Sequence, residues 1–247
     1  MTTYYTDSFY ASLTPGSRSS ASVVVPELIR LLRPSSVIDV GCGTGVWAAE
    51  FIGHGIERVL GVDGAYVPAQ KLEIDRRRFA VHDLSTPLKL PDSFDLAISV
   101  EVAEHLPSAR AQGFVTDLAA LAPTILFSAA IPGQGGTGHL NEQWPEYWKG
   151  LFLERGFELL DCIRPLVWND SRVDWWYRQN LFLLVSRDTR FASDPEHREF
   201  PLNVIHPELF ELKTKFPTMG DVVREIPHAL ARSINYRVSR HGRCKNH

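Results

Sequence analysis

The chain has 247 residues, of which 44% are hydrophobic and 22% charged, and its formal net charge is −3 at pH 7. This composition is typical of a globular α/β protein with one main domain, and it lacks the basic character of a general nucleic-acid-binding protein. Three scattered cysteines exclude a disulfide framework and a Cys-x-x-Cys zinc site. The N-terminal residues lack a signal-peptide pattern and no apolar stretch could span a bilayer, so we expect a cytoplasmic protein.

Residues 1–20 are rich in Tyr, Ser and Thr and contain Pro15-Gly16, so we expect an N-terminal arm or lid there, before a helix over 23–32. Short apolar runs then alternate with helical patterns. Strands are expected at 37–40, 58–63, 78–82, 94–100, 124–130, 157–163 and 179–186. Helices are expected at about 45–53, 108–121 and 144–155. Continuous apolar strands separated by helices predict a Rossmann-like, doubly wound α/β fold with a seven-stranded, mostly parallel sheet and an antiparallel final strand.

A glycine-spaced loop follows the first expected strand. Gly41, Gly43 and Gly45 stand at alternate positions, where missing β-carbons allow a ligand to approach the backbone. The spacing is Gly-x-Gly-x-Gly, whereas a dinucleotide fingerprint is Gly-x-Gly-x-x-Gly. Asp39 just before the loop would repel phosphate and suits an amine-bearing ligand. Residues 37–45 resemble the first motif of the class I S-adenosylmethionine (SAM) dependent methyltransferases, although the loop alone leaves a dinucleotide site open.

Three further elements extend this resemblance over residues 20–165. Asp63 ends the second strand about 20 residues after the loop, the distance at which a Rossmann-like unit places an acid on ribose hydroxyls. The resemblance implies that Asp83 binds the adenine amino group and that Leu84 flanks the ring, and Ser99–Pro107 is similar to a segment of small-molecule methyltransferases. The alternative is that these acids only end strands and cap helices. The expected SAM-binding residues are Ser20, Asp39, Gly41, Cys42, Gly43, Gly45, Asp63, Gly64, Asp83, Leu84, Glu101 and Val102.

The resemblance divides the chain into three parts. Residues 1–20 are the arm, 21–187 the SAM-binding methyltransferase domain and 188–247 an appendage without its own core. Ser20 is expected to face the methionine carboxylate, with helix capping as an equally good explanation.

The loop over 132–145, just after the fifth strand, contains the expected catalytic residues. Methyl transfer needs alignment of nucleophile and methyl group, and an alcohol also needs a base. An imidazole suits that role at neutral pH, so His139 is the first candidate, with orientation of Glu142 or helix capping as the alternative. His105 is the second candidate. No metal is expected; a Mg²⁺ ion, if bound, would take ligands from Glu101, His105, His139 and Asp170.

Aromatic residues crowd the expected acceptor side, which suits stacking on a sugar, although core packing explains at least half of them. Residues 138–148 and 204–210 resemble bacterial methyltransferases associated with glycan and polysaccharide assembly. This implies O-methylation of a saccharide, with a small-molecule or oligosaccharide acceptor as partner. Three alternatives stay open: O- or N-methylation of a nonsugar small molecule or peptide, RNA methylation using Arg76–Arg78 and the basic C-terminus, and a noncatalytic SAM-binding subunit. A homodimer through residues 188–247 is also left open.

Overall fold

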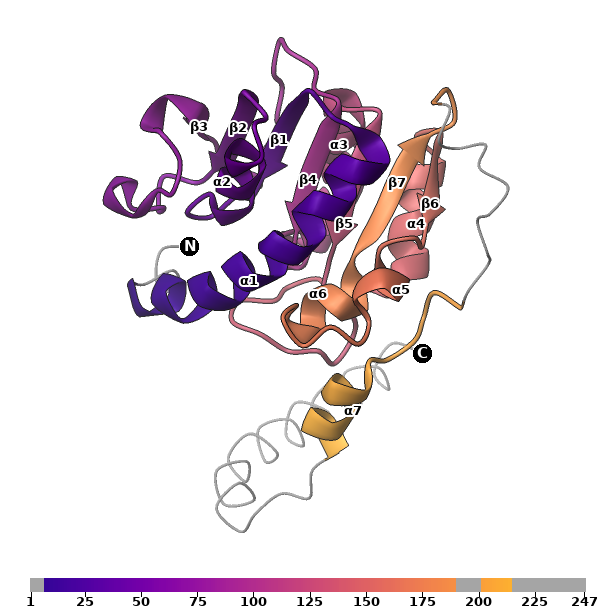
Figure 1. The fold of residues 1–247 in the computed structure, drawn as a ribbon. Helices are drawn as coiled ribbons and strands as arrows, with labels where there is room; N and C mark the ends of the chain where they lie inside the picture. Colours follow the sequence, from indigo (N-terminus) through magenta and orange to yellow (C-terminus); the bar gives the residue numbers. More distant parts are fainter. Residues whose placement is uncertain (1–6, 190–200, 215–247) are drawn as a thin grey trace, which may run out of the picture. The chain divides into compact units, whose positions relative to one another are not determined.

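A computed structural model describes residues 7–189 and 201–214 of the chain (Figure 1). All seven strands and most helices belong to a compact unit that ends at Leu209, and Phe210 begins a second unit. Cys244 and the basic C-terminal residues lie outside the described residues. The expected division into arm, domain and appendage therefore stays a prediction.

The sheet has seven strands in the order β3-β2-β1-β4-β5-β7-β6. The first five run parallel, whereas β7 is antiparallel to both β5 and β6. This confirms the predicted Rossmann-like sheet with its antiparallel final strand. The strands are β1 (Ser36–Val40), β2 (Arg58–Asp63), β3 (Phe79–Val81), β4 (Leu96–Val100), β5 (Thr124–Ser128), β6 (Phe157–Leu160) and β7 (Phe182–Ser186).

Helices cover both faces of the sheet (Figure 1). The α-helices are α1 (Asp7–Leu32), α2 (Val46–Gly53), α3 (Ala111–Leu121), α4 (Pro145–Leu153), α5 (Arg164–Val167), α6 (Trp175–Asn180) and α7 (Pro207–Thr214). Short 3₁₀ turns are η1 (Ala69–Lys71), η2 (Arg76–Arg78), η3 (Ala103–His105) and η4 (Ser108–Arg110). None of the helices within residues 7–189 and 201–214 is long and apolar enough to cross a membrane.

Two expectations about loops were wrong. Helix α1 begins at Asp7, so Pro15 and Gly16 lie inside it and not in a loop. Close packing explains the glycine: a β-carbon on Gly16 would lie 2.1 Å from the Asp174 carboxylate, so a larger residue could not pack there without moving that side chain. No helix was expected between the strands at 157–163 and 179–186, but the short helices α5 and α6 lie there.

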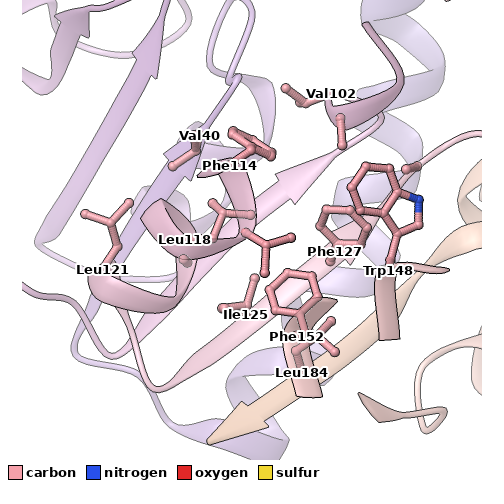
Figure 2. Close-up of a cluster of buried hydrophobic side chains, with 14 of the residues drawn as sticks. Val40, Val102, Phe114, Leu118, Leu121, Ile125, Phe127, Trp148, Phe152 and Leu184 are labelled. Carbon is pink, nitrogen blue, oxygen red and sulfur yellow. The ribbon is translucent and has the colours of Figure 1, made fainter. Parts of the chain in front are cut away.

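The core consists of two layers, because alternate residues of each buried strand point to opposite faces. Ile38 and Ile125 pack with α3 and α4 on one face, whereas Val37 and Leu126 pack with α1 and α2 on the other. Figure 2 shows the first layer, where Phe114, Phe127, Trp148 and Phe152 are among the largest buried side chains. The rings of Phe127 and Trp148 are 5.2 Å apart, which places Trp148 in the core and not in an acceptor site.

Candidate active site

A cavity of about 570 Å³ opens at the carboxyl ends of β1, β2 and β4, the edge where ligands bind in doubly wound folds. Its walls come from the glycine loop, the segment after β4, the loop after β5 and the helices α1 and α6. Of the expected site residues, the cavity lining includes Asp39, Gly41, Cys42, Gly43, Asp63, Asp83, Leu84, Glu101, Val102, His105 and His139.

The glycine loop adopts the backbone that its spacing predicts. Gly41, Gly43 and Gly45 have φ values of +83°, +54° and +84°, a region that side-chain-bearing residues rarely occupy. At Gly41 a β-carbon would also lie 2.4 Å from Val102, so this position needs glycine for space as well as for conformation. Gly45 precedes α2 but does not line the cavity. The loop thus joins β1 to α2 with its backbone exposed to the cavity.

Two buried carboxylates lie at the ends of β1 and β2. Burial, with the nearby charge of Asp63, raises the pKa of Asp39 to about 8. The Oδ2 atom of Asp39 has no hydrogen-bond partner within the described residues. Burial also raises the pKa of Asp63, although its carboxylate accepts hydrogen bonds from Gly43 N and Gly64 N at 2.6 Å each. A positively charged group entering beside Asp39 would satisfy a carboxylate that is otherwise costly to bury.

Tyr66 is a site residue that the sequence reasoning missed. Its hydroxyl donates to Asp63 Oδ1 at 2.5 Å, the carboxylate on which ribose hydroxyls are expected. Asp63 Oδ1 therefore accepts from both Gly64 N and Tyr66 before any ligand is present. Gly64, an expected cofactor contact, does not line the cavity and instead holds this carboxylate. No local pattern marks Tyr66, which follows Asp63 by three residues.

The segment after β3 supplies the next wall. Asp83 is exposed at the cavity, and its Oδ1 accepts from Ser85 N at 3.0 Å, which lowers the pKa of the carboxyl. Leu84 beside it is buried and lines the same cavity. The two side chains therefore present an acceptor and an apolar surface side by side.

Glu101 follows β4 in a strained conformation, with φ at +55°. Its carboxylate accepts from Gln134 Nε2 at 3.0 Å and from Asn180 Nδ2 at 3.1 Å, and Asn180 also donates to Gln134 Oε1 at 2.9 Å. This closed set of three side chains ties the end of β4 to the loop after β5 and to α6. Strain held by such contacts is typical of functional sites.

His139 lies in the loop after β5, which puts it at the predicted end of the cavity. Its Nδ1 is 2.9 Å from Glu142 Oε1, and Gly133 N and Gly135 N donate to the same carboxylate at 2.8 and 2.7 Å. Glu142 does not line the cavity but orients the ring that does. A carboxylate only accepts hydrogen bonds, so His139 donates from Nδ1 and, when neutral, carries its lone pair on Nε2.

His105 stands against His139, with ring centroids 4.9 Å apart and planes at 88°. Burial, followed by the proximity of His139, lowers the pKa of His105 to about 4, so this imidazole is neutral at physiological pH. Glu104, which the sequence reasoning missed, lies beside both rings with no exposed surface. Burial and the charge of Glu101 raise the pKa of Glu104 well above its usual value.

Of the four residues named as ligands in case a Mg²⁺ ion binds, only His105 and His139 converge. Both oxygens of Glu101 accept from side-chain amides, and Asp170 forms an ion pair with Arg172 at 2.6 Å outside the cavity. Among the described residues, the acidic and imidazole groups that do converge are those of Glu104, His105 and His139, whose ligand atoms lie within 4.8 Å of one another. The magnesium set is therefore corrected, because local pairing already occupies two of its members.

The N-terminal helix contributes different residues from the expected one. Thr14 and Ser17 line the cavity, whereas Ser20 is fully buried and not part of the lining. The Ser20 hydroxyl donates to Gly16 O at 2.8 Å and accepts from Asp174 N at 2.9 Å. This structural use of the hydroxyl corrects the expectation that Ser20 faces the methionine carboxylate.

Aromatic side chains also line the cavity and form its aromatic wall. Trp47, Trp175, Trp176 and Tyr177 line the cavity, and the rings of Trp47 and Tyr177 lie 5.2 Å apart. Trp168 is instead stacked near His206, with ring centroids 4.6 Å apart, away from the cavity lining. Fewer aromatic side chains thus line the cavity than the sequence suggested, and their contact with an acceptor stays a prediction.

The basic run Arg76–Arg78 is occupied locally. Arg77 pairs with Asp75 at 2.7 Å, Arg76 donates to Phe79 O at 2.6 Å, and Arg78 donates to the carbonyl of Glu57. These contacts explain the run as a turn-stabilising element and give no positive surface at the cavity.

Part of the chain matches the model of a known protein family. Residues 21–124 match the family model of a methyltransferase domain. No curated protein sequence matches the chain at a significant level.

Solved structures share the fold at low identity. A sugar N-methyltransferase from Streptoalloteichus matches with a TM-score of 0.56 and 16% identity over 74% of this chain and 92% of its own. An amino pentose methyltransferase from Micromonospora echinaspora with bound SAM gives 0.52 and 17% over 74% and 97%. Magnesium protoporphyrin IX methyltransferase from Synechocystis, with bound S-adenosylhomocysteine, gives 0.52 and 18% over 72% and 87%.

Proposed function

We propose that this protein, a SAM-dependent methyltransferase with the class I fold, transfers the methyl group of SAM to a hydroxyl group of a saccharide. The observation that carries the proposal is the His139–Glu142 pair at a cavity that aromatic side chains also line. A polysaccharide intermediate in biosynthesis is the acceptor class that fits the glycan-type resemblance of residues 138–148.

SAM is proposed to lie along the carboxyl ends of β1, β2 and β3. In this placement the ammonium group meets Asp39, the ribose hydroxyls meet Asp63, and the adenine meets Asp83 and Leu84. The unpartnered Oδ2 of Asp39 supports the first contact, and the exposed position of Asp83 at the cavity supports the last. Displacement of the Tyr66 hydroxyl from Asp63 would free an acceptor for a ribose hydroxyl.

Methyl transfer then forms an O–C bond as the C–S bond of the sulfonium breaks in line. The acceptor proton passes to His139 Nε2, and Glu142 stabilises the resulting imidazolium through Nδ1. Proton acceptance by such a positioned base contributes about 10²–10⁴-fold in rate. His105, held neutral by its surroundings, shapes the same end of the cavity without adding positive charge.

The saccharide assignment rests on the aromatic wall. Trp175 and Trp176 are half-buried at the cavity, with ring centroids 5.3 Å apart, so part of each ring can contact an apolar sugar face. Two proteins of similar fold are described as a sugar N-methyltransferase and an amino pentose methyltransferase, which supports a sugar as acceptor.

The test is transfer of labelled methyl from SAM to mono- and oligosaccharides, amino sugars, phenols, amines, peptides and RNA. We expect label in a saccharide as an alkali-stable methyl ether. His139→Ala and Glu142→Gln should lower kcat by about 10²-fold or more with SAM affinity unchanged. Label on an amine would change the acceptor to an amino sugar or a nonsugar compound. Full turnover by His139→Ala would remove the proposed base.

A further inference from the structure

The side chains of Glu104, His105 and His139 converge at the acceptor end of the cavity. Their ligand atoms lie within 4.8 Å of one another, and all three residues line the cavity. Glu104 has no exposed surface, and neither of its carboxylate oxygens has a hydrogen-bond partner within the described residues. The carboxyl of Glu101 interacts with that of Glu104, and two neighbouring buried carboxyl groups are costly as anions unless one of them keeps a proton or a cation joins them.

Both imidazoles are held in the way that metal-binding histidines are held. His139 donates from Nδ1 to the Glu142 carboxylate at 2.9 Å, which leaves Nε2 as its acceptor. His105 interacts with the backbone of Gly138, which fixes its ring against the same loop. Hydrogen bonds from a histidine to a carboxylate or a carbonyl orient the ring for coordination and set which nitrogen carries the lone pair.

The backbone joins the two segments that supply these side chains. The carbonyl of Glu104 accepts from Leu140 N at 2.7 Å and from Asn141 N at 3.0 Å. Gly136 leaves room for the second imidazole, because a β-carbon there would lie 2.3 Å from His139 Nε2. The three groups are therefore positioned by the fold and not by a chance approach of flexible side chains.

We infer that Glu104, His105 and His139 bind a divalent first-row transition metal ion. Two imidazoles and one carboxylate suit Mn²⁺, Fe²⁺, Co²⁺ or Zn²⁺, whereas Mg²⁺ and Ca²⁺ prefer all-oxygen sets. Glu101 is excluded from the ligand set because amide donors already occupy both of its oxygens.

The consequence for catalysis rests on the proposed function. An ion at this position would lower the pKa of an acceptor hydroxyl that it binds. In the metal-loaded protein His139 would be a ligand, and the acidified acceptor hydroxyl would lose its proton to solvent water. In the metal-free protein the imidazole accepts the proton itself.

The test measures metal binding without SAM or acceptor, so its failure is separate from failure of the saccharide assay. The full-length protein is stripped with a chelator, freed of chelator, and titrated with Co²⁺ while the visible absorption is followed, and then with Mn²⁺ by calorimetry. We expect saturation at one equivalent, and we expect a large excess of Mg²⁺ not to displace Co²⁺.

Variants identify the ligands. Glu104→Gln should weaken Co²⁺ binding by about 100-fold or more, and Glu142→Gln, which only orients His139, by about 10- to 100-fold. Asp170→Asn is the matched control and should bind as the wild type does. If Glu104→Gln loses its thermal unfolding transition, His105→Asn replaces it. Absence of saturable binding in the wild type, or unchanged binding in the ligand variants, would overturn the inference.

Discussion

Binding of SAM should release a proton, because Asp39 is protonated in the ligand-free protein at neutral pH. Burial and the charge of Asp63 raise the pKa of Asp39 to about 8, and the thiol of Cys42 is the other titratable group beside it. The α-amino group of SAM has an ordinary pKa of about 7.7–8.0. Near pH 6.5 Asp39 and the α-amino group of SAM thus each carry a titratable proton. The ammonium–carboxylate pair that they form holds only one of these two protons. About 0.9 proton should be released per SAM bound at that pH.

The same protonation sets the pH dependence of affinity. At pH 6 about 1% of Asp39 is ionised, whereas at pH 8 about half of it is ionised and about half of the amine is still charged. SAM should therefore bind about 20-fold more tightly at pH 8 than at pH 6, with the optimum near pH 8. Below this optimum the affinity falls because Asp39 is protonated, and above it the affinity falls because the α-amino group of SAM loses its charge.

Calorimetry in buffers of different ionisation enthalpy measures both the affinity and the proton release. Asp39→Asn is the matched variant, since it keeps the size of the side chain but cannot ionise. It should bind SAM more weakly at pH 8 and show less than about twofold change in affinity between pH 6 and 7. A wild-type affinity that changes less than about threefold from pH 6 to 8, without proton release, would refute the contact between Asp39 and the ammonium group.

Stability of the ligand-free protein should follow the opposite trend. Because the folded pKa of Asp39 exceeds its unfolded value, the native state binds more protons between about pH 4 and 8. This contribution to the free energy of unfolding is complete below about pH 4 and is lost as the pH rises through about 8. Asp39→Asn should flatten the decline, which urea denaturation at several pH values would measure.

Three other substitutions test the geometry. Gly136→Ala should lower kcat with unchanged SAM affinity, because its β-carbon would displace the imidazole of His139. Gly53→Ala is the control, because nothing lies near a β-carbon at that position. Equal turnover of the two variants would contradict the argument. Gly41→Ala should lose about 1–3 kcal/mol of stability from its positive φ, together with SAM binding, as calorimetry and urea denaturation would show. Gln179→Ala should unfold at a lower urea concentration, because it leaves the carbonyl of Val204 and the N–H of His206 without their partner. The free energy of unfolding should fall by about 1–3 kcal/mol for each of these groups that stays unpaired. Unchanged stability would show that both groups find other partners.

The cofactor half of the cavity could be predicted from the sequence because its signals are local. A strand end, a glycine loop and an acid at the next strand end are fixed by short spacing, and Gly41, Asp39 and Asp63 occupy the expected places. The helix over 7–20 could not be predicted, because Pro15 and Gly16 usually interrupt helices and the approach of Asp174 to Gly16 is not visible in the sequence. Ser20 was misplaced for the same reason, since its partner Asp174 is 154 residues away.

The acceptor half depends on contacts that no spacing reveals. Gln179 donates to Val204 O at 2.6 Å and accepts from His206 N, and His206 Nε2 is 2.9 Å from Trp168 O. Residues 201–209 thereby hold the segment that ends in α6, the helix whose Trp175 forms part of the aromatic wall. This contact lies outside the methyltransferase domain match at 21–124. Residues 201–209, which lie outside that match, therefore help to position part of the aromatic wall, and Gln179→Ala should raise the KM of the proposed acceptor more than it changes SAM affinity.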